Sequence, residues 1–241
     1  KPWVKVGISP FGIWRPGNPP GVRGLDAYAE IYADSRKWLR EGWCDYFAPE
    51  LYWPTTSKGQ NFAALLDWWN GENTSKRYVW PGLDTDRVGR SWQSSEIANQ
   101  IGLIRKYPNP GELHWSMLVL MKNAALDEAL TNELYTAPAL IPPFPWLGSE
   151  PPLMPELTVT AKKGAAQASW KGVGTNSPSW WLLQSRKKEK WITQIFPAGQ
   201  SDAYLDDSSD AIAVRAVSRT GILSEAAVWS RSKFGQKQRV K

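Results

Sequence analysis

The chain has 241 residues, of which 42% are hydrophobic and 22% are charged. This is the composition of a globular protein with a substantial core, and the length suits one large domain or two ordinary ones. No apolar run approaches the roughly 20 residues that cross a bilayer, so we expect no membrane span. The opening residues, KPWVKVGISPF, lack the apolar core of a secretory leader and give no cellular address.

Two rare residue types limit the chemistry. Cys44 is the only cysteine, which excludes an intrachain disulfide and a cysteine-rich metal site. His114 is the only histidine and no HExxH stretch exists, so a Ser-His-Asp triad or a metalloprotease site would have to use that one residue. We therefore expect no metal and no cofactor. The 16 tryptophans instead favour aromatic stacking on a ligand.

The net charge of +6 is unevenly distributed. Residues 1–155 hold 15 Lys and Arg against 16 Asp and Glu, whereas residues 156–241 hold 14 against 7. The basic clusters lie at residues 186–190 and in the tail at 231–241. Neither has the interleaved aromatic residues of an RNA-binding surface, so we interpret them as solvated and expect no nucleic acid partner.

In chain order, the first 135 residues alternate strand and helix four times. The predicted strands are residues 4–9, 45–53, 78–84 and 111–120. The predicted helices are residues 25–42, 61–71, a segment that begins at Ser94 or Ser95, and 123–134. This spacing is typical of βα units with parallel strands. No GxGxxG or GxxxxGK[ST] motif follows any strand, so a (β/α)8 barrel is favoured over a nucleotide-binding sheet. A full barrel needs eight strands, and only four are predicted.

The composition changes after residue 136. Residues 137–155 are rich in proline and predict an extended connector. Short strand-like runs separated by turn signals follow at residues 156–161, 165–170, 179–185, 190–196 and 211–218. They predict an all-β sandwich over residues 156–234, followed by a basic tail at 235–241.

Several stretches together resemble a known family. KPWVKVGISPFGIWR, YADSRKWLREGWCDYFAPELYW and the Ser-Met pair after Trp115 are similar to the second half of the glycosyl hydrolase-like 10 family. The resemblance covers about residues 1–147. It implies a bacterial (β/α)8-barrel protein that cuts polysaccharide, including the glycan strands of peptidoglycan. From Pro155 onward the chain resembles a fibronectin type III domain, through Trp170 and AVRAVSRTGILSE.

The resemblance also accounts for the four missing strands. In the family, strands one to four and an acidic motif precede the block that opens this chain. The predicted fold class is therefore α/β: the C-terminal half of a TIM-type barrel over residues 1–136, with the sandwich appended. We expect a missing N-terminal half-barrel or self-association to cover the open edges. By resemblance, the protein is secreted, periplasmic or in the cell envelope.

Two carboxylates are the candidate catalytic residues. Barrel enzymes hold their chemistry at the carboxyl ends of the strands, where Glu50 and Asp84 lie. Glycoside hydrolysis commonly uses two carboxyl groups that flank the scissile bond. Pairing with an arginine for Glu50, and capping of a loop for Asp84, remain open alternatives. The family more often has an amide where Glu50 stands, so a substrate-binding role is equally open, with the partner carboxylate on the absent strands.

The remaining candidates bind substrate. Aromatic rings suit the apolar faces of sugars, and their polar edges and other polar groups take hydrogen bonds. The candidates are Trp14, Arg15, Tyr52, Trp53, Trp80, His114 and Trp115. Arg15 would bind a carboxylate-bearing sugar, and His114 has the alternative of a core histidine. The predicted function is part of a glycoside hydrolase, with a non-catalytic carbohydrate- or cell-wall-binding protein as the alternative.

Overall fold

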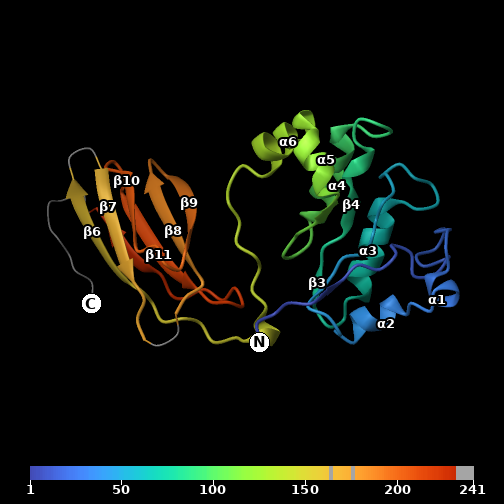
Figure 1. The fold of residues 1–241 in the computed structure, drawn as a ribbon, viewed down its shortest axis with the longest axis horizontal. Coiled ribbons are helices and arrows are strands. Elements are labelled where there is room, and N and C mark those ends of the chain that lie inside the picture. Colours follow the sequence, from blue (N-terminus) through green and yellow to red (C-terminus); the bar gives the residue numbers. More distant parts are fainter. Residues whose placement is uncertain (163–164, 175–176, 232–241) are drawn as a thin grey trace. The chain divides into compact units, whose positions relative to one another are not determined.

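The computed structural model describes residues 1–162, 165–174 and 177–231. The chain forms two compact units, one of residues 4–136 and one of residues 137–241 together with residues 1–3 (Figure 1). The predicted basic tail at 235–241 lies outside the described residues. Each unit is described by itself.

The first unit is built on short parallel strands. They are β1 (Gly7–Ile8), β2 (Tyr46–Phe47), β3 (Tyr78–Val79), β4 (Gly82–Asp84) and β5 (Leu113–Trp115). The order β1-β2-β3 is parallel, and β4 pairs with β5 in parallel. Glu50 connects these sheets through parallel bridges to Phe11 and Gly82. Pro81, which has no amide proton, stands where β3 gives way to β4. The α/β class is thus confirmed, whereas the half-barrel remains a proposal.

Helices connect the strands, as the crossovers of parallel strands require. They are α1 (Ala27–Glu30), α2 (Ser35–Arg40), α3 (Phe62–Glu72), α4 (Ser94–Ile104), α5 (Met117–Lys122) and α6 (Ala124–Ala129), with the short turns η1 (Thr85–Arg87) and η2 (Leu130–Leu134). The predictions for α3 and α4 are confirmed. The Asn61 side chain caps α3 by accepting a hydrogen bond from the Ala64 amide at 3.0 Å.

Two predictions of secondary structure were wrong in part. The single helix expected at residues 25–42 is two short helices, because Tyr32 adopts a positive φ of 55° and Asp34 caps a new start. The strand expected at 111–120 ends at Trp115, and residues 117–122 form α5. The apolar run suggested a strand, but its Met and Leu residues have good helix propensity, and the segment forms a helix.

The core of this unit lies between the strands and the helices. Phe47 and Leu83 are fully buried with Trp69 of α3 and Ile97 of α4, and the rings of Phe47 and Trp69 are 5.0 Å apart. Because side chains alternate along a strand, the neighbours of Phe47 and Leu83 point to the opposite side. We call this side the Tyr46 face; by register it carries Tyr46, Ala48, Glu50, Gly82, Asp84, Leu113 and Trp115.

The second unit is a sandwich of two antiparallel sheets. Its strands are β6 (Glu156–Lys162), β7 (Ala165–Lys171), β8 (Trp180–Lys187), β9 (Lys190–Pro197), β10 (Asp202–Asp206), β11 (Ala211–Val217) and β12 (Ala227–Ser230). One sheet has the order β10-β7-β6 and the other β12-β11-β8-β9. The predicted β-sandwich is confirmed, and Trp170, which is 3% exposed, lies in its core. Its assignment to the fibronectin type III class remains a prediction.

Two features of the second unit were not expected. Strand β10 was missed, because only Ala203 and Leu205 supply its short apolar pattern. Part of the proline-rich connector packs on the sandwich: Phe144 is fully buried, and its amide donates to the Thr220 carbonyl at 2.7 Å. The turn η3 (Pro145–Leu147) follows it. Among the described residues, none of the helices combines the length and apolar composition that crossing a membrane would require.

Candidate active site

Glu50 lies just beyond β2, at the carboxyl end of that strand. Its amide donates to the Pro10 carbonyl at 3.0 Å, which holds the residue beside the chain that leaves β1. Gly12 permits this approach, since a Cβ there would lie 2.2 Å from the Glu50 carbonyl oxygen. Burial raises the pKa of the Glu50 carboxyl, and the Ser9 hydroxyl partly opposes that shift. Glu50 therefore holds a proton to higher pH than an exposed glutamic acid does.

Tyr52 lies between the two candidate carboxylates. Its ring packs over Gly82, where an added Cβ would come within 3.1 Å of Tyr52 Cε1. Burial raises the pKa of Tyr52 to about 12, and the negative charges of Glu50 and then Asp84 contribute to the rise. The phenol is therefore neutral at physiological pH and can donate a hydrogen bond.

Asp84 is the last residue of β4 and is almost fully buried. Its Oδ2 accepts a hydrogen bond from Arg87 Nε at 2.9 Å, in an ion pair. Thr85 Oγ1 donates to the Trp115 carbonyl at 2.7 Å, which ties β5 to the end of β4. Trp115 is in register with Asp84 and its side chain is 61% exposed. The structure thus brings Glu50, Tyr52, Asp84 and Trp115 together on the Tyr46 face.

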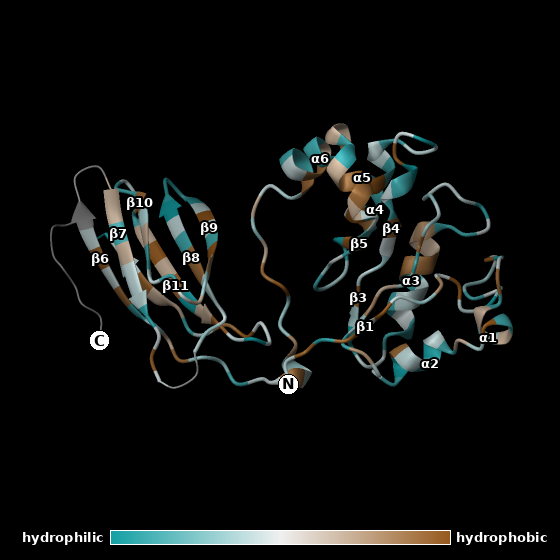
Figure 2. Cartoon of the chain, in the orientation of Figure 1, coloured by the Kyte–Doolittle hydropathy of each residue, from teal (hydrophilic) through white to brown (hydrophobic). Residues whose placement is uncertain are grey.

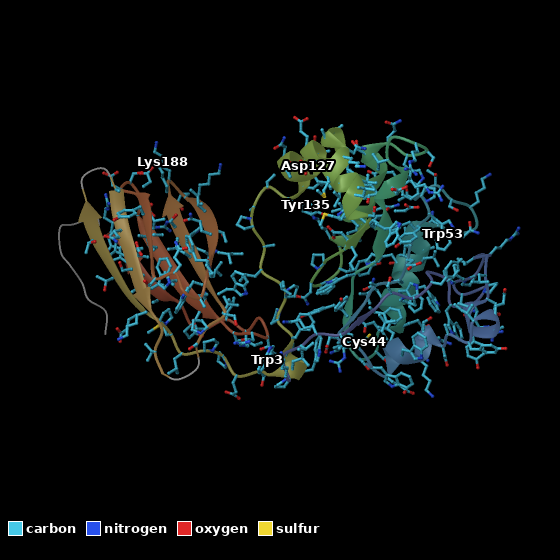
Figure 3. The ribbon with its side chains drawn as sticks, viewed as in Figure 1. Trp3, Cys44, Trp53, Asp127, Tyr135 and Lys188 are labelled. Carbon is cyan, nitrogen blue, oxygen red and sulfur yellow. The ribbon has the colours of Figure 1, made fainter. Side chains whose placement is uncertain are left out.

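Trp53 and Trp80 lie close to this group. Trp53, labelled in Figure 3, is half-buried and meets the Phe11 ring edge-on at 5.6 Å, in the turn that follows Glu50. Trp80 stacks on Tyr78 and Tyr46, with ring centroids 5.1 and 5.2 Å apart. Trp53 therefore packs partly against the helix-covered core, three residues after Glu50, whereas Trp80 belongs to an aromatic stack two residues before Gly82.

Trp14 and Arg15 are held by the first three helices. Trp14 stacks on Trp68 of α3 at 6.1 Å, and its Nε1 donates to Asp34 Oδ1 at 3.2 Å. Arg15 forms an ion pair with Asp26 at 3.1 Å. These contacts fix the loop after β1, and the ion pair engages one of the guanidinium nitrogens with which Arg15 was expected to bind a sugar carboxylate. The structure does not group these two residues with Glu50.

His114 lies on the other side of β5. It is in register with Leu83, whose side chain is in the helix-covered core. His114 Nε2 is 3.0 Å from the Tyr135 hydroxyl, which also hydrogen-bonds to Glu112; Figure 3 labels Tyr135. Burial lowers the pKa of His114. This placement favours the alternative of a core histidine.

Comparison with known proteins connects this geometry to a family. The model of the family described as Glycosyl hydrolase-like 10 matches residues 1–97, which include β1 to β4, Glu50, Tyr52 and Asp84. The predicted resemblance is thereby confirmed for this part of the chain.

Curated relatives agree with the glycosyl hydrolase-like 10 match. Glycosyl hydrolase YngK of Bacillus subtilis is 36% identical over 171 residues, which are 66% of this chain and 34% of YngK. Glycosyl hydrolase DigH of Escherichia coli K12 is 44% identical over 73 residues, which are 29% of this chain and 17% of DigH. The chain thus spans about a third of the length of YngK and less of DigH.

Similarity to solved structures is weaker. The spore cortex lytic enzyme SleM of Clostridium perfringens aligns with a TM-score of 0.30 and 11% identity, over 83% of this chain and 84% of SleM. The glycoside hydrolase domain of Endo-D from Streptococcus pneumoniae R6 aligns with a TM-score of 0.27 and 17% identity, over 35% of this chain and 15% of that one. These values are too low to support an argument about fold or function.

The glycosyl hydrolase-like 10 region also has site residues that sequence reasoning missed. Ser9 is the last residue of the strand predicted at residues 4–9; its hydroxyl donates to the Ala48 carbonyl at 2.9 Å and also lowers the pKa of the Glu50 carboxyl. Arg87 forms the ion pair with Asp84, and the three-residue spacing of a helical turn was the available signal. Within the described ranges, no group of three or more His, Cys, Asp and Glu side chains is placed to hold a metal ion.

Proposed function

We propose that the protein is a glycoside hydrolase that acts on a bacterial polysaccharide, with peptidoglycan glycan strands as the leading candidate. One observation carries the proposal. Glu50 and Asp84 lie at the carboxyl ends of parallel strands, and the negative charges of both raise the pKa of the same residue, Tyr52. The names of YngK and DigH support the hydrolase class. This chain would supply one wall of the cleft.

The environments of the two carboxyl groups suggest their roles. Burial favours the protonated form of Glu50, which suits a general acid that donates its proton to the leaving-group oxygen as the glycosidic bond breaks. Asp84 faces the Arg87 guanidinium and suits the carboxylate role. It would take the proton of the attacking water or attack the sugar itself. The neutral Tyr52 would donate a hydrogen bond that orients the sugar.

Aromatic residues would bind the flanking sugar units. Trp115 presents an exposed ring in register with Asp84, and Trp53 lies three residues after Glu50. Both would stack on the apolar faces of sugar rings. Trp80 would extend this surface along the Tyr46 face. Trp14 and Arg15 would act indirectly, since their contacts fix the loop after β1.

A second half would complete the cleft. Leu113, Trp115, Met117, Leu118 and Met121 are all exposed on β5 and α5, the last strand of the sheet and the helix after it. An apolar strip beside an unpaired strand edge is unfavourable in water. We propose that an N-terminal half-barrel, or a second copy of the chain, covers it. This would give a TIM-type barrel, and a wall-directed enzyme of this kind would act outside the cytoplasm.

The test is the release of reducing ends from purified peptidoglycan glycan strands by the completed assembly. We expect Glu50→Gln to lower turnover at least about 100-fold, because the proton donor is lost, while glycan binding is retained. The control is Glu41→Gln, which changes an exposed carboxylate 3.9 Å from Lys37. Unchanged turnover in Glu50→Gln would exclude Glu50 as the acid.

The same measurement distinguishes the alternative, a non-catalytic carbohydrate-binding protein. Trp53, Trp80 and Trp115 would bind a sugar whether or not Glu50 transfers a proton. If wild-type protein binds the glycan strands but releases no reducing ends, binding without cleavage is the function.

A further inference from the structure

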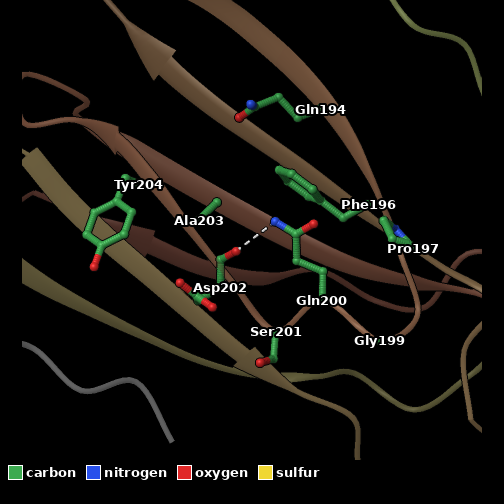
Figure 4. Close-up of a pocket in the computed structure, with 9 residues that line it drawn as sticks. All are labelled: Gln194, Phe196, Pro197, Gly199, Gln200, Ser201, Asp202, Ala203 and Tyr204. Carbon is green, nitrogen blue, oxygen red and sulfur yellow. Dashed lines mark hydrogen bonds between the residues drawn. The ribbon is translucent and has the colours of Figure 1, made fainter.

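The second unit, the sandwich, has a groove of its own. Figure 4 shows it between β9 and β10, with the turn that joins them at one end. Its volume is about 750 Å³. The side chains that carry its chemistry are Gln194, Phe196, Gln200, Ser201, Asp202 and Tyr204.

The unequal number of strands in the two sheets creates this groove. Strand β9 is the edge of the four-stranded sheet, and β10 is the edge of the three-stranded sheet. Phe196 is in register with Trp181, and Gln194 with Leu183, and both partners are buried in the sandwich core. Phe196 and Gln194 therefore point to the inner side of their sheet, at its edge beside β10.

The floor of the groove is aromatic. Phe196 is half-buried, and its ring lies 5.5 Å from that of Trp170, which is part of the core. The ring is therefore fixed in place while part of it stays accessible. A fixed aromatic ring at the base of a hollow suits the apolar face of a sugar.

Two glutamine amides line the groove beside this ring, whereas the Asp202 side chain alternates with the buried Ala203 and lies on the outer side of β10. The Gln194 side chain makes no hydrogen bond to any described residue. Gln200 Nε2 donates to the Asp202 carbonyl at 3.1 Å, which orients its amide toward the groove, as Figure 4 shows. Asp202 Oδ2 accepts from Gln167 Nε2 at 3.3 Å. The two amides that line the groove offer both donors and acceptors to the hydroxyls of a ligand.

We propose that this groove binds an uncharged sugar unit of a polysaccharide. None of the residues that line it is basic, and Asp202 would repel an acidic sugar. The sandwich would hold a glycan through this groove. This inference rests on the proposed glycoside hydrolase function in one respect, namely that the ligand is a glycan.

The test is an NMR titration of the whole chain with the tetramer of N-acetylglucosamine. We expect saturable shifts of the backbone amides of residues 194–204. Gln194→Ala should weaken the binding about fivefold or more, because a hydrogen-bonding group is lost. The matched control is Gln184→Ala, which removes an amide on β8 that donates to Thr193 Oγ1 at 3.4 Å. This control should bind like the wild type.

Two further measurements separate this groove from the carboxylate site and test its preference for a neutral sugar. Glu50→Gln should leave the shifts of residues 194–204 unchanged, so a failed hydrolase assay does not affect this test. Tetragalacturonate, an acidic tetramer, should bind more weakly than the neutral one. The proposal is overturned if the neutral tetramer leaves residues 194–204 unshifted, if Gln194→Ala binds normally, or if only an extended peptide occupies the groove.

Discussion

The two units differ in how their sheets are covered. In the sandwich, both sheets turn buried residues such as Ala168 and Val214 toward a shared core. In the first unit, the helices cover only the face that carries Phe47 and Leu83. The Tyr46 face and the β5–α5 segment leave apolar side chains exposed, and Figure 2 shows α5 in the colour of hydrophobic residues.

This difference places the candidate catalytic residues and the self-contained core in different units. The sandwich meets its own need for burial, so its core residues are expected to serve stability alone. The candidate catalytic residues lie on the less covered face of the first unit, where covering by a further half would also complete a cleft. Substitutions at matched residues in the two units test whether the units differ in this way.

The largest expected effect is on the sandwich. Trp170→Ala should lower the free energy of unfolding of that unit by about 3–5 kcal/mol, because it removes a buried ring from the core. The matched change Trp115→Ala removes an exposed ring from the first unit and should cost little. Chemical denaturation followed by circular dichroism measures both. If the two variants lost the same free energy of unfolding, Trp115 would be as important for stability as the core residue Trp170, and the two units would not differ in this respect.

The second-largest effect on stability is expected for a glycine substitution in the first unit. Gly12→Ala would place a Cβ 2.2 Å from the Glu50 carbonyl oxygen, so the backbone must move. We expect a loss of about 3 kcal/mol in the free energy of unfolding, because backbone yields poorly to overpacking. Gly71→Ala in α3, where a Cβ meets nothing within 4 Å, should instead stabilise by roughly 0.5 kcal/mol. Thermal unfolding of both variants is the measurement, and a stable Gly12→Ala protein would contradict the tight packing of Glu50.

A smaller effect should depend on pH. Glu72 accepts hydrogen bonds from Arg36 Nε at 2.8 Å and from Arg40 Nε at 2.5 Å. Burial alone would raise the pKa of Glu72, but the two guanidinium groups lower it below its ordinary value of 4.5. Its contribution is therefore present above pH 4.5 and lost as the pH falls through the folded-state pKa.

Replacing that carboxylate should flatten the acid side of the stability curve. Glu72→Gln should cost about 1 kcal/mol near neutral pH, because the arginines are partly exposed and solvent screens the interaction. The difference between variant and wild type should shrink as the pH falls below 4.5. Urea unfolding at a series of pH values measures this, and a difference that is constant with pH would argue against the ion pairs as its source.

The smallest effect on stability should come from the exposed helix α5. Met121 is 78% exposed, so Met121→Ser should leave the unfolding of the isolated chain unchanged. If α5 is covered by a second half or a second copy, the same change should weaken that association. Sedimentation equilibrium checks this, and association that is unaffected by Met121→Ser would place the covered surface elsewhere.

The sequence predicted the arrangement of the chain better than the details of the site. The alternation of strands and helices was readable because α3 has the Asn61 cap and both α3 and α4 have periodic apolar residues. The break at Tyr32 was not readable, since a positive φ at a tyrosine leaves no trace in the hydrophobic pattern. Strand β10 was too short to stand out.

For the candidate site, strand-end reasoning placed Glu50, Tyr52, Asp84 and Trp115 in one region. It failed for His114, because the strand β5 turns that side chain toward the helices, and strand register is set by tertiary pairing. It also failed for Trp14, whose partners Asp34 and Trp68 are distant in sequence. Such contacts follow from packing and cannot be read from local spacing.

The central claim is that Glu50 acts as the proton donor in glycan cleavage, and the pH profile of kcat/KM in Ser9→Ala tests it most directly. The Ser9 hydroxyl favours the charged form of Glu50, so its removal should raise the pKa of that carboxyl further. An acid must be protonated to act; the alkaline limb of the profile should therefore move to higher pH than in the wild type. A limb that stays in place, or moves to lower pH, would contradict the assignment of Glu50.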